Sequence, residues 1–256
     1  MSARPGSEMS EARAEPEAMA ATTVPGAKLV RGIWLPATER HFADMLEHHS
    51  KIGDVDGKGT YQLHKLRQAM GYIGPLRRRV AVDVGAHVGL WAMHMVKDFE
   101  RVVAFEPVPL HRRLFALNVP AGKYEIHACA LGRVPGRVRI TVPPGTTGSA
   151  HVVVGERLAG EKRGPTVEAE VRTLDSFGLE AVDFVKIDVE GFELEVLRGA
   201  EATLLRCRPY VIVEQKKNDE RNFGRPKYEA LAWLEAMGWR RTFEYGGDFF
   251  LSAAEG

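Results

Sequence analysis

The chain has 256 residues, of which 45% are apolar and 27% are charged, and its 35 Lys and Arg residues nearly balance 34 Asp and Glu residues. These values are typical of one ordinary globular domain with additions, and they argue against strong, sequence-independent binding to nucleic acid. Two cysteines are too few for a disulfide framework or a cysteine-rich zinc site. Since no run approaches the roughly 18 apolar residues of a membrane span and no secretory signal opens the sequence, we expect a cytoplasmic protein.

Composition and periodicity divide the chain into three parts. Residues 1–27 are rich in Ala, Glu, Pro, Ser and Met and contain no aromatic residue, so we expect a disordered tail. Residues 28–78 carry apolar residues at helical spacing, which predicts an N-terminal helical extension that could act as a substrate lid. Residues 79–256 are expected to form the ligand-binding domain.

Short β-branched runs alternate with helical patterns after Arg79, which predicts an α/β fold with a Rossmann-like, mostly parallel central sheet and helices on both faces. The predicted strands are Val80–Val84, Val102–Phe105, Tyr124–Ala128, Val182–Ile187 and Tyr210–Val213. The predicted helices are Leu90–Phe99, Pro109–Asn118, Glu193–Leu205 and Pro226–Met237. Alternating runs within residues 133–173 predict inserted β-hairpins, and the pair Gly246-Gly247 predicts a terminal antiparallel β-hairpin.

A glycine turn follows the first predicted strand, with Asp83, Gly85 and Gly89 in an Asp-x-Gly-x-x-x-Gly pattern. Gly85 permits a tight turn and a close approach of ligand to backbone, and Gly89 should let the next helix pack closely against the strand. A dinucleotide-binding turn would carry a further glycine where Ala86 and His87 stand. A nucleoside with a small tail therefore fits this turn better than a diphosphate does.

The second predicted strand is followed at once by Glu106, which lies 17 residues beyond Gly89. An acid at this place is suited to a bidentate contact with ribose hydroxyls. The glycine turn and this acid together predict a ligand that contains a nucleoside.

Acidic residues mark the ends of four predicted strands. These residues are Asp83, Glu106, Asp188 and Glu214. Because ligands of an open parallel sheet bind beyond the carboxyl ends of its strands, we expect all four at one binding edge. Glu190 is a further site candidate beside Gly191, whereas Glu193 is expected to cap the following helix. Lys186 lies in a strand fit for burial and should pair with a carboxylate, namely Asp83, Asp188 or Glu214.

The glycine turn and Phe105-Glu106-Pro107 resemble the first two motifs of class I S-adenosylmethionine-dependent methyltransferases. The later run Lys186-Ile-Asp188-Val-Glu190-Gly191 closely resembles the signature of the FkbM family, and Pro209–Glu214 is similar to that family's fifth strand. The resemblance covers roughly residues 79–250. One departure is His87, because the family more often has Asn at that position.

This resemblance implies a class I methyltransferase fold and an enzyme, an S-adenosyl-L-methionine-dependent O-methyltransferase that acts on a hydroxyl of a small molecule or sugar. It also implies a set of cofactor-binding residues: Asp83, Gly85, Ala86, His87, Gly89, Glu106, Pro107, Ala130, Leu131 and Asp188. The family's acceptors vary widely, so the acceptor and the oligomeric state stay open. We expect residues 28–78 and the hairpins around Gly145–Ala150 to form the acceptor walls.

An aliphatic hydroxyl is a poor nucleophile while protonated, and a positioned base contributes about 10²–10⁴-fold to the rate. The candidate catalytic residues are the carboxylates Asp188, Glu190 and Glu214, with Asp188 or Glu214 favoured as the base. The same three residues could instead hold magnesium, but we favour a site without metal.

Two other functions stay open from the sequence. A ribose 2′-O-methyltransferase acting on RNA would need lysines beside the reacting hydroxyl, and Lys186 and Lys216 are the candidates. A non-catalytic S-adenosylmethionine-binding module would bind the cofactor without turnover. The acids expected at the binding edge argue against such a module, and the absence of aromatics among the basic runs argues against a nucleic-acid platform.

Overall fold

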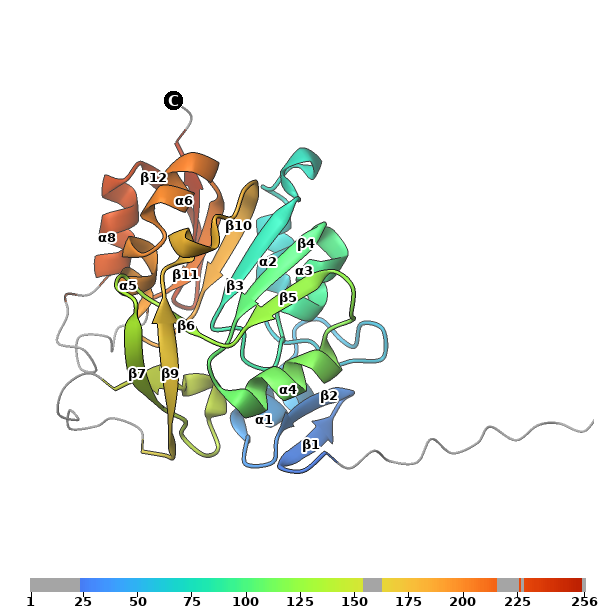
Figure 1. Ribbon diagram of the computed structural model, residues 1–256. Helices are drawn as coiled ribbons and strands as arrows, with labels where there is room; N and C mark the ends of the chain where they lie inside the picture. The colour runs from blue at the N-terminus through green and yellow to red at the C-terminus, as the bar shows by residue number, and fades with distance from the viewer. Residues whose placement is uncertain (1–23, 154–162, 216–225, 227, 255–256) are drawn as a thin grey trace, which may run out of the picture.

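The computed structural model describes residues 24–153, 163–215, 226 and 228–254, and a seven-stranded sheet forms its centre (Figure 1). The strand order is β12-β13-β11-β10-β3-β4-β5. Neighbours from β11 to β5 are parallel, while β13 is antiparallel to both β11 and β12. The strands are β3 (Val80–Val84), β4 (Arg101–Phe105), β5 (Tyr124–His127), β10 (Val182–Ile187), β11 (Tyr210–Glu214), β12 (Trp239–Tyr245) and β13 (Asp248–Ala253).

Helices cover both faces of this sheet, as the sequence predicts, because the central strands are apolar on both sides. Ala81 of β3 joins the core cluster with helices α2 (Leu63–Met70), α3 (Ala92–Asp98) and α4 (Pro109–Asn118). Val80, Val82 and Val84 join the opposite cluster with helices α5 (Glu193–Arg198), α6 (Glu201–Cys207) and α8 (Glu229–Ala236). The alternation along β3 therefore fixes which layer each residue meets.

The single helix predicted over Glu193–Leu205 is two helices, α5 and α6, which are separated at Gly199. A Cβ on Gly199 would lie 2.0 Å from the carbonyl oxygen of Gly132. The backbone thus approaches the strand region beside β6 at the helix break, and no larger residue could stand there without a shift.

The inserted hairpins form one small sheet with the order β6-β9-β7-β8. Its strands are β6 (Ala130–Leu131), β7 (Gly136–Thr141), β8 (His151–Val152) and β9 (Thr166–Arg172), and the 3-10 turns η2 (Thr147–Ser149) and η3 (Leu174–Phe177) adjoin it. The predicted terminal hairpin is confirmed as β12 and β13, which join at Gly246-Gly247. The fold is the predicted α/β fold with a central sheet rich in parallel strands.

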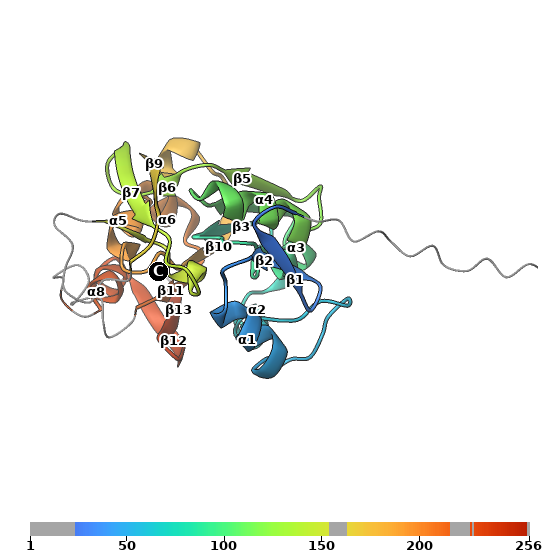
Figure 2. The ribbon, with the colours of Figure 1, turned by 90° about the horizontal axis from the view of Figure 1, so that it is seen from below.

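The N-terminal extension is not purely helical, because a β-hairpin precedes its helices. Strands β1 (Ala27–Val30) and β2 (Ile33–Pro36) join through Arg31 and Gly32, both at positive φ, and are followed by α1 (His41–His48), α2 and the 3-10 turn η1 (Pro75–Arg77). Four-residue strands carry too little alternation for the sequence to reveal them. Figure 2 shows β1 and β2 gathered beside α4, with α1 and α2 on the same side of the molecule.

A buried amide fastens this hairpin to the main domain. Asn118, at the end of α4, accepts from the N–H of Trp34 at 2.8 Å and donates to the carbonyl oxygens of Trp34 and Val88 at 2.9 and 2.8 Å. Residues 1–23, most of the predicted tail, lie outside the described residues. No helix in the described ranges is long and apolar enough to cross a membrane.

Candidate functional site

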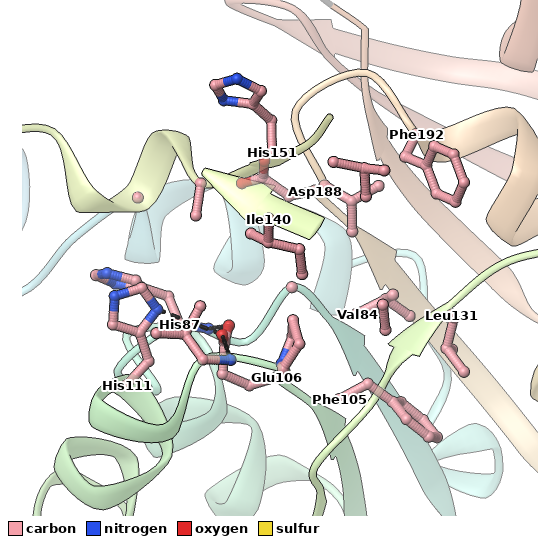
Figure 3. Close-up of a pocket in the computed structure, with 18 of the residues that line it drawn as sticks. Val84, His87, Phe105, Glu106, His111, Leu131, Ile140, His151, Asp188 and Phe192 are labelled. Carbon is pink, nitrogen blue, oxygen red and sulfur yellow. Dashed lines mark hydrogen bonds and ion pairs between the residues drawn. The ribbon is translucent and has the colours of Figure 1, made fainter. Parts of the chain in front are cut away.

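A pocket opens at the carboxyl ends of β3, β4 and β10, where a parallel sheet is expected to bind its ligand (Figure 3). Its walls are the glycine turn after β3, the residues after β4, strand β6, and the part of the small sheet that includes η2 and β8. Seven of the predicted cofactor-binding residues line it: Gly85, His87, Glu106, Pro107, Ala130, Leu131 and Asp188. Asp83, Ala86 and Gly89 lie behind this lining.

Gly85 lets the ends of β3 and β10 meet at the pocket. Its φ is +76°, and a Cβ there would lie only 2.0 Å from the carbonyl oxygen of Asp188. The residue therefore has to be glycine for both conformational and steric reasons. The tight turn agrees with the sequence pattern, but the close neighbour is the backbone of Asp188, and the approach of a ligand stays a prediction.

Gly89 also needs to be glycine, but its close neighbour differs from the one predicted. Its φ is +85°, and a Cβ would lie 2.5 Å from Cγ2 of Val119 and 3.0 Å from the ring of Phe115. The glycine packs against the end of α4 rather than against strand β3. Sequence spacing alone could not show which element would fold over the turn.

Glu106 is 5% exposed and is held by the loops on either side of it. One carboxylate oxygen accepts from the N–H of His87 at 2.8 Å, and the other accepts from the N–H of Val108 at 2.8 Å. The ring Nδ1 of His111 lies 3.3 Å from the second oxygen. Because each carboxylate oxygen can accept more than one hydrogen bond, Glu106 keeps acceptor capacity for a pair of hydroxyls.

His111 and the small sheet supply pocket walls that the motifs did not identify. His111 lies in the first turns of α4, five residues after Glu106, and its ring packs 4.2 Å from the His87 ring. Thr147, Ile140 and Val152 come from the inserted hairpins, from which the sequence analysis expects walls for the acceptor. The spacing of an acid and a histidine across a helix start could have suggested His111, whereas no motif assigns the other three residues to this pocket.

The three predicted catalytic carboxylates come together at the edge of the sheet. Asp188 follows β10, Glu190 lies two residues further in a left-handed conformation (φ +54°), and Glu214 ends β11. One carboxylate oxygen from each lies within 4.8 Å of the others. Such a group can accept a proton or hold a hard divalent cation such as magnesium. Asp188 alone among them also lines the pocket.

Lys186 lies beneath these carboxylates and is 5% exposed. Its Nζ lies 3.6 Å from Oδ1 of Asp83 and 3.5 Å from Oδ2 of Asp188, and it donates to the carbonyl oxygen of Gly85 at 3.5 Å. Burial alone would lower the pKa of Lys186, but Asp188, Asp83 and other nearby carboxylates outweigh it and raise the pKa above its usual value. The lysine therefore stays charged and pairs with two of the predicted acids.

Two other groups at this edge have structural roles. Burial raises the pKa of Cys129, which lines the pocket, to about 11, so its thiol stays protonated at neutral pH. Glu193 accepts from the N–H groups of Gly191 and Val189 at 2.9 and 3.2 Å, and so it holds the turn ahead of α5 rather than the first N–H groups of the helix that it was expected to cap. Lys216, considered above as a partner for RNA, lies outside the described residues.

Residues 83–245 match the methyltransferase FkbM domain family. The chain is 31% identical to the methyltransferase sdnD of Sordaria araneosa, over 63% of this chain and 73% of sdnD. It is 26% identical to methyltransferase 1 of Beauveria bassiana, over 47% of this chain and 57% of that protein, so it spans little more than half of that relative. A crystal structure of methyltransferase FkbM from Methylobacillus flagellatus aligns with a TM-score of 0.42 at 20% identity, over 68% of this chain and 43% of that one.

Proposed function

On the premise that this chain belongs to the FkbM methyltransferase family, we propose that it is an S-adenosylmethionine-dependent O-methyltransferase that acts on a hydroxyl of a small molecule or sugar. One observation carries the proposal. Asp188 both lines the pocket at the glycine turn and belongs to a group of three carboxylates whose oxygens lie within 4.8 Å of one another. A nucleoside site and a candidate base thus share one edge of the sheet.

The residues present fit S-adenosylmethionine in their chemistry. Glu106 would hold the ribose hydroxyls, Gly85 and Asp188 would border the methionine part, and Leu131 belongs to an apolar wall suited to adenine. When bound, the cofactor supplies an activated methyl group together with its leaving group. The protein's own task is then to orient an acceptor oxygen and to take its proton.

Asp188 and Glu214 are the proposed bases. Five carboxylates gather around this edge, those of Asp83, Asp188, Glu190, Glu214 and Asp248, and the two lysines Lys186 and Lys65 form ion pairs among them. This gathering of acids supports a carboxylate as the acceptor of the hydroxyl proton.

The burial of Lys186 favours a small acceptor over RNA. A ribose 2′-O-methyltransferase would use lysines that reach the nucleic acid, but the Lys186 ammonium is covered and already paired with Asp83 and Asp188. Lys186, the lysine candidate among the described residues, therefore does not support an enzyme that acts on RNA.

Cofactor binding is tested by the variant Glu106→Ala. A hydrogen bond to a charged group is worth about 1.5–3 kcal/mol, so binding of S-adenosylmethionine should weaken at least roughly tenfold in calorimetry. Glu125→Ala, which removes a half-exposed carboxylate from neighbouring β5, is the matched control and should bind normally. Wild-type affinity in folded Glu106→Ala would remove Glu106 from the site, and binding of NADH by the wild type would overturn the choice of cofactor.

The chemistry is tested by methylation of a panel of glycosides and aliphatic alcohols with S-adenosylmethionine, in single turnover, for Asp188→Asn, Glu190→Gln and Glu214→Gln. Loss of the carboxylate that acts as base should lower the rate about 10²–10⁴-fold while cofactor stays bound. Full rates in all three variants would exclude a carboxylate base. Loss of wild-type activity with chelator and its return with magnesium would replace the metal-free site by a metal site.

A further inference from the structure

A hydrogen-bonded series of three polar side chains links the N-terminal extension to the pocket. Its members are Glu39, Thr147 and His87. Glu39 lies between β2 and α1 and is 0% exposed, and its Oε2 accepts from the hydroxyl and the N–H of Thr147, both at 2.5 Å. The Thr147 Oγ1 in turn lies 3.0 Å from Nε2 of His87. Glu39 lies outside residues 83–245, the part of the chain that the family matches.

The donor and the acceptor of each hydrogen bond in this series can be assigned. Oε1 of Glu39 accepts from the N–H of Phe42 at 3.0 Å, so both oxygens of Glu39 act as acceptors. The Thr147 hydroxyl has one hydrogen and donates it to Glu39, which leaves its oxygen to accept from His87. His87 must then carry its ring hydrogen on Nε2, and its Nδ1 carries only a lone pair.

His87 occupies a central place in the pocket wall. Its N–H donates to Glu106, its ring packs 4.2 Å from the His111 ring and 5.2 Å from the Phe42 ring, and His87 and His111 lie side by side in Figure 3. Its Nδ1 is buried and has no hydrogen-bond partner among the described residues. Among the described residues, the one hydrogen bond that orients this ring is therefore the contact of its Nε2 with Thr147.

We propose that Glu39 is a positioning residue of the cofactor pocket, which acts through Thr147 to hold the His87 ring as the Nε2–H tautomer beside the ribose-binding Glu106. The inference rests on the proposed function, since it assigns a role toward bound S-adenosylmethionine. It assigns Glu39, within the N-terminal extension, to the cofactor site, in addition to the acceptor walls expected from residues 28–78.

The charge of the ring explains why the tautomer matters. Burial, with smaller effects from His111 and Lys186, lowers the pKa of His87 well below its usual value. A neutral ring leaves the negative charge of Glu106 available to hydroxyl donors, and it does not repel a cationic cofactor. The unprotonated Nδ1 is the ring's remaining acceptor, so loss of the Thr147 contact would free the ring to turn or to change tautomer.

The test combines a spectrum with a binding measurement on the full chain. In ¹⁵N-histidine-labelled wild type without ligand, we expect the His87 signals of an Nε2–H tautomer, identified by their loss in His87→Asn. Thr147→Val keeps the shape of the side chain but removes the hydroxyl. It should give mixed tautomers and bind S-adenosylmethionine about three- to tenfold more weakly, the loss of about one hydrogen bond.

Controls separate positioning from packing. Thr147→Ser keeps the hydroxyl and should restore both the spectrum and the affinity. Thr146→Val changes the adjacent residue, which is not part of the hydrogen-bonded series, and should alter neither. Glu39→Ala should reproduce Thr147→Val. An Nδ1–H tautomer in the wild type, or wild-type affinity in folded Thr147→Val, would overturn the inference. Wild type that shows the expected spectrum but no binding of S-adenosylmethionine would instead overturn the proposed function.

Discussion

The glycine turn with Glu106 and the N-terminal extension of residues 24–78 both hold the pocket in place, but they use different kinds of contact. Around Glu106, the carboxylate binds backbone N–H groups within two and 19 residues of itself, and glycine spacing fixes the turn. The extension instead uses single side chains that reach distant partners, as in Glu39 to Thr147 and Lys65 to Asp248. The first kind of contact leaves a motif in the sequence, whereas the second kind leaves a single polar residue.

Two contacts of the extension, Glu39 to Thr147 and Lys65 to Asp248, are buried, which makes their loss costly. Lys65 of α2 pairs with Asp248 of β13, and both side chains are less than a tenth exposed. Asp248 lies opposite Glu214 in the strand register, so this pair ties the extension to the carboxylate edge of the main sheet. Loss of one such buried contact in the extension should therefore destabilise the whole domain.

The largest effect is expected for Lys65→Met. Breaking a buried ion pair leaves a buried charge without compensation, so the free energy of unfolding should fall by about 3–5 kcal/mol in urea titrations. The burial of Asp248 already raises its pKa against the opposing effect of Lys65, and without the lysine this carboxyl would be driven to take up a proton.

The matched control is Lys97→Met, which breaks the more exposed pair between Lys97 and Asp56. Exposed pairs contribute about 0–1 kcal/mol, so this variant should unfold nearly like the wild type. Equal losses of unfolding free energy in Lys65→Met and Lys97→Met would mean that the buried pair stabilises the fold no more than the exposed pair does.

A smaller effect, dependent on pH, is expected at the junction of the two regions. His94 of α3 is 4% exposed, and burial, with smaller contributions from Lys97 and Arg67, lowers its pKa to about 4. The unfolded chain binds this proton near pH 6.5, so the stability that His94 contributes is complete above that pH and is lost as the pH falls toward 4. The lowering of the pKa by about 2.5 units, at about 1.4 kcal/mol per unit, corresponds to a loss of about 3.5 kcal/mol when it is complete.

The measurement compares unfolding of wild type and His94→Gln at pH 7 and pH 4.5. The difference between them isolates His94 from the carboxyl groups that titrate in the same range. His48→Gln, at an exposed position of α1, should retain the wild-type pH dependence. If His94→Gln also retained the wild-type pH dependence, the pKa of His94 would not be lowered in the folded protein. The junction would then be more hydrated than the burial of His94 indicates.

The sequence predicted features that depend on local contacts and missed those that depend on contacts distant in the sequence. The order of strands and helices after Arg79, and the meeting of Asp188, Glu190 and Glu214 at one edge, follow from local periodicity and from the geometry of parallel strands. The β1–β2 hairpin was missed because four-residue strands with one turn carry almost no period, and because long-range packing on α4 stabilises them.

The pocket shows the same division between local and distant information. Gly85 and Glu106 both line the pocket because each follows directly on a strand whose end a motif marks, and their contact with a cofactor stays a prediction. Thr147 could not be assigned, because its partners Glu39 and His87 lie 108 and 60 residues away. A hydroxyl in an insertion looks like any other surface residue until the fold brings its partners together.

The smallest effect is expected for removal of residues 1–23. Their composition cannot bury a core, so the free energy of unfolding and the affinity for S-adenosylmethionine should each change by less than about 0.5 kcal/mol. Extending the deletion through Val30 should be far more costly, because it removes β1, whose Ala27 and Val30 pack against the core cluster. Thermal unfolding of the two truncations would locate where the extension begins to matter. A fall of many degrees in the shorter truncation would show that the first 23 residues dock on the domain, and the expectation of a disordered tail would then be wrong.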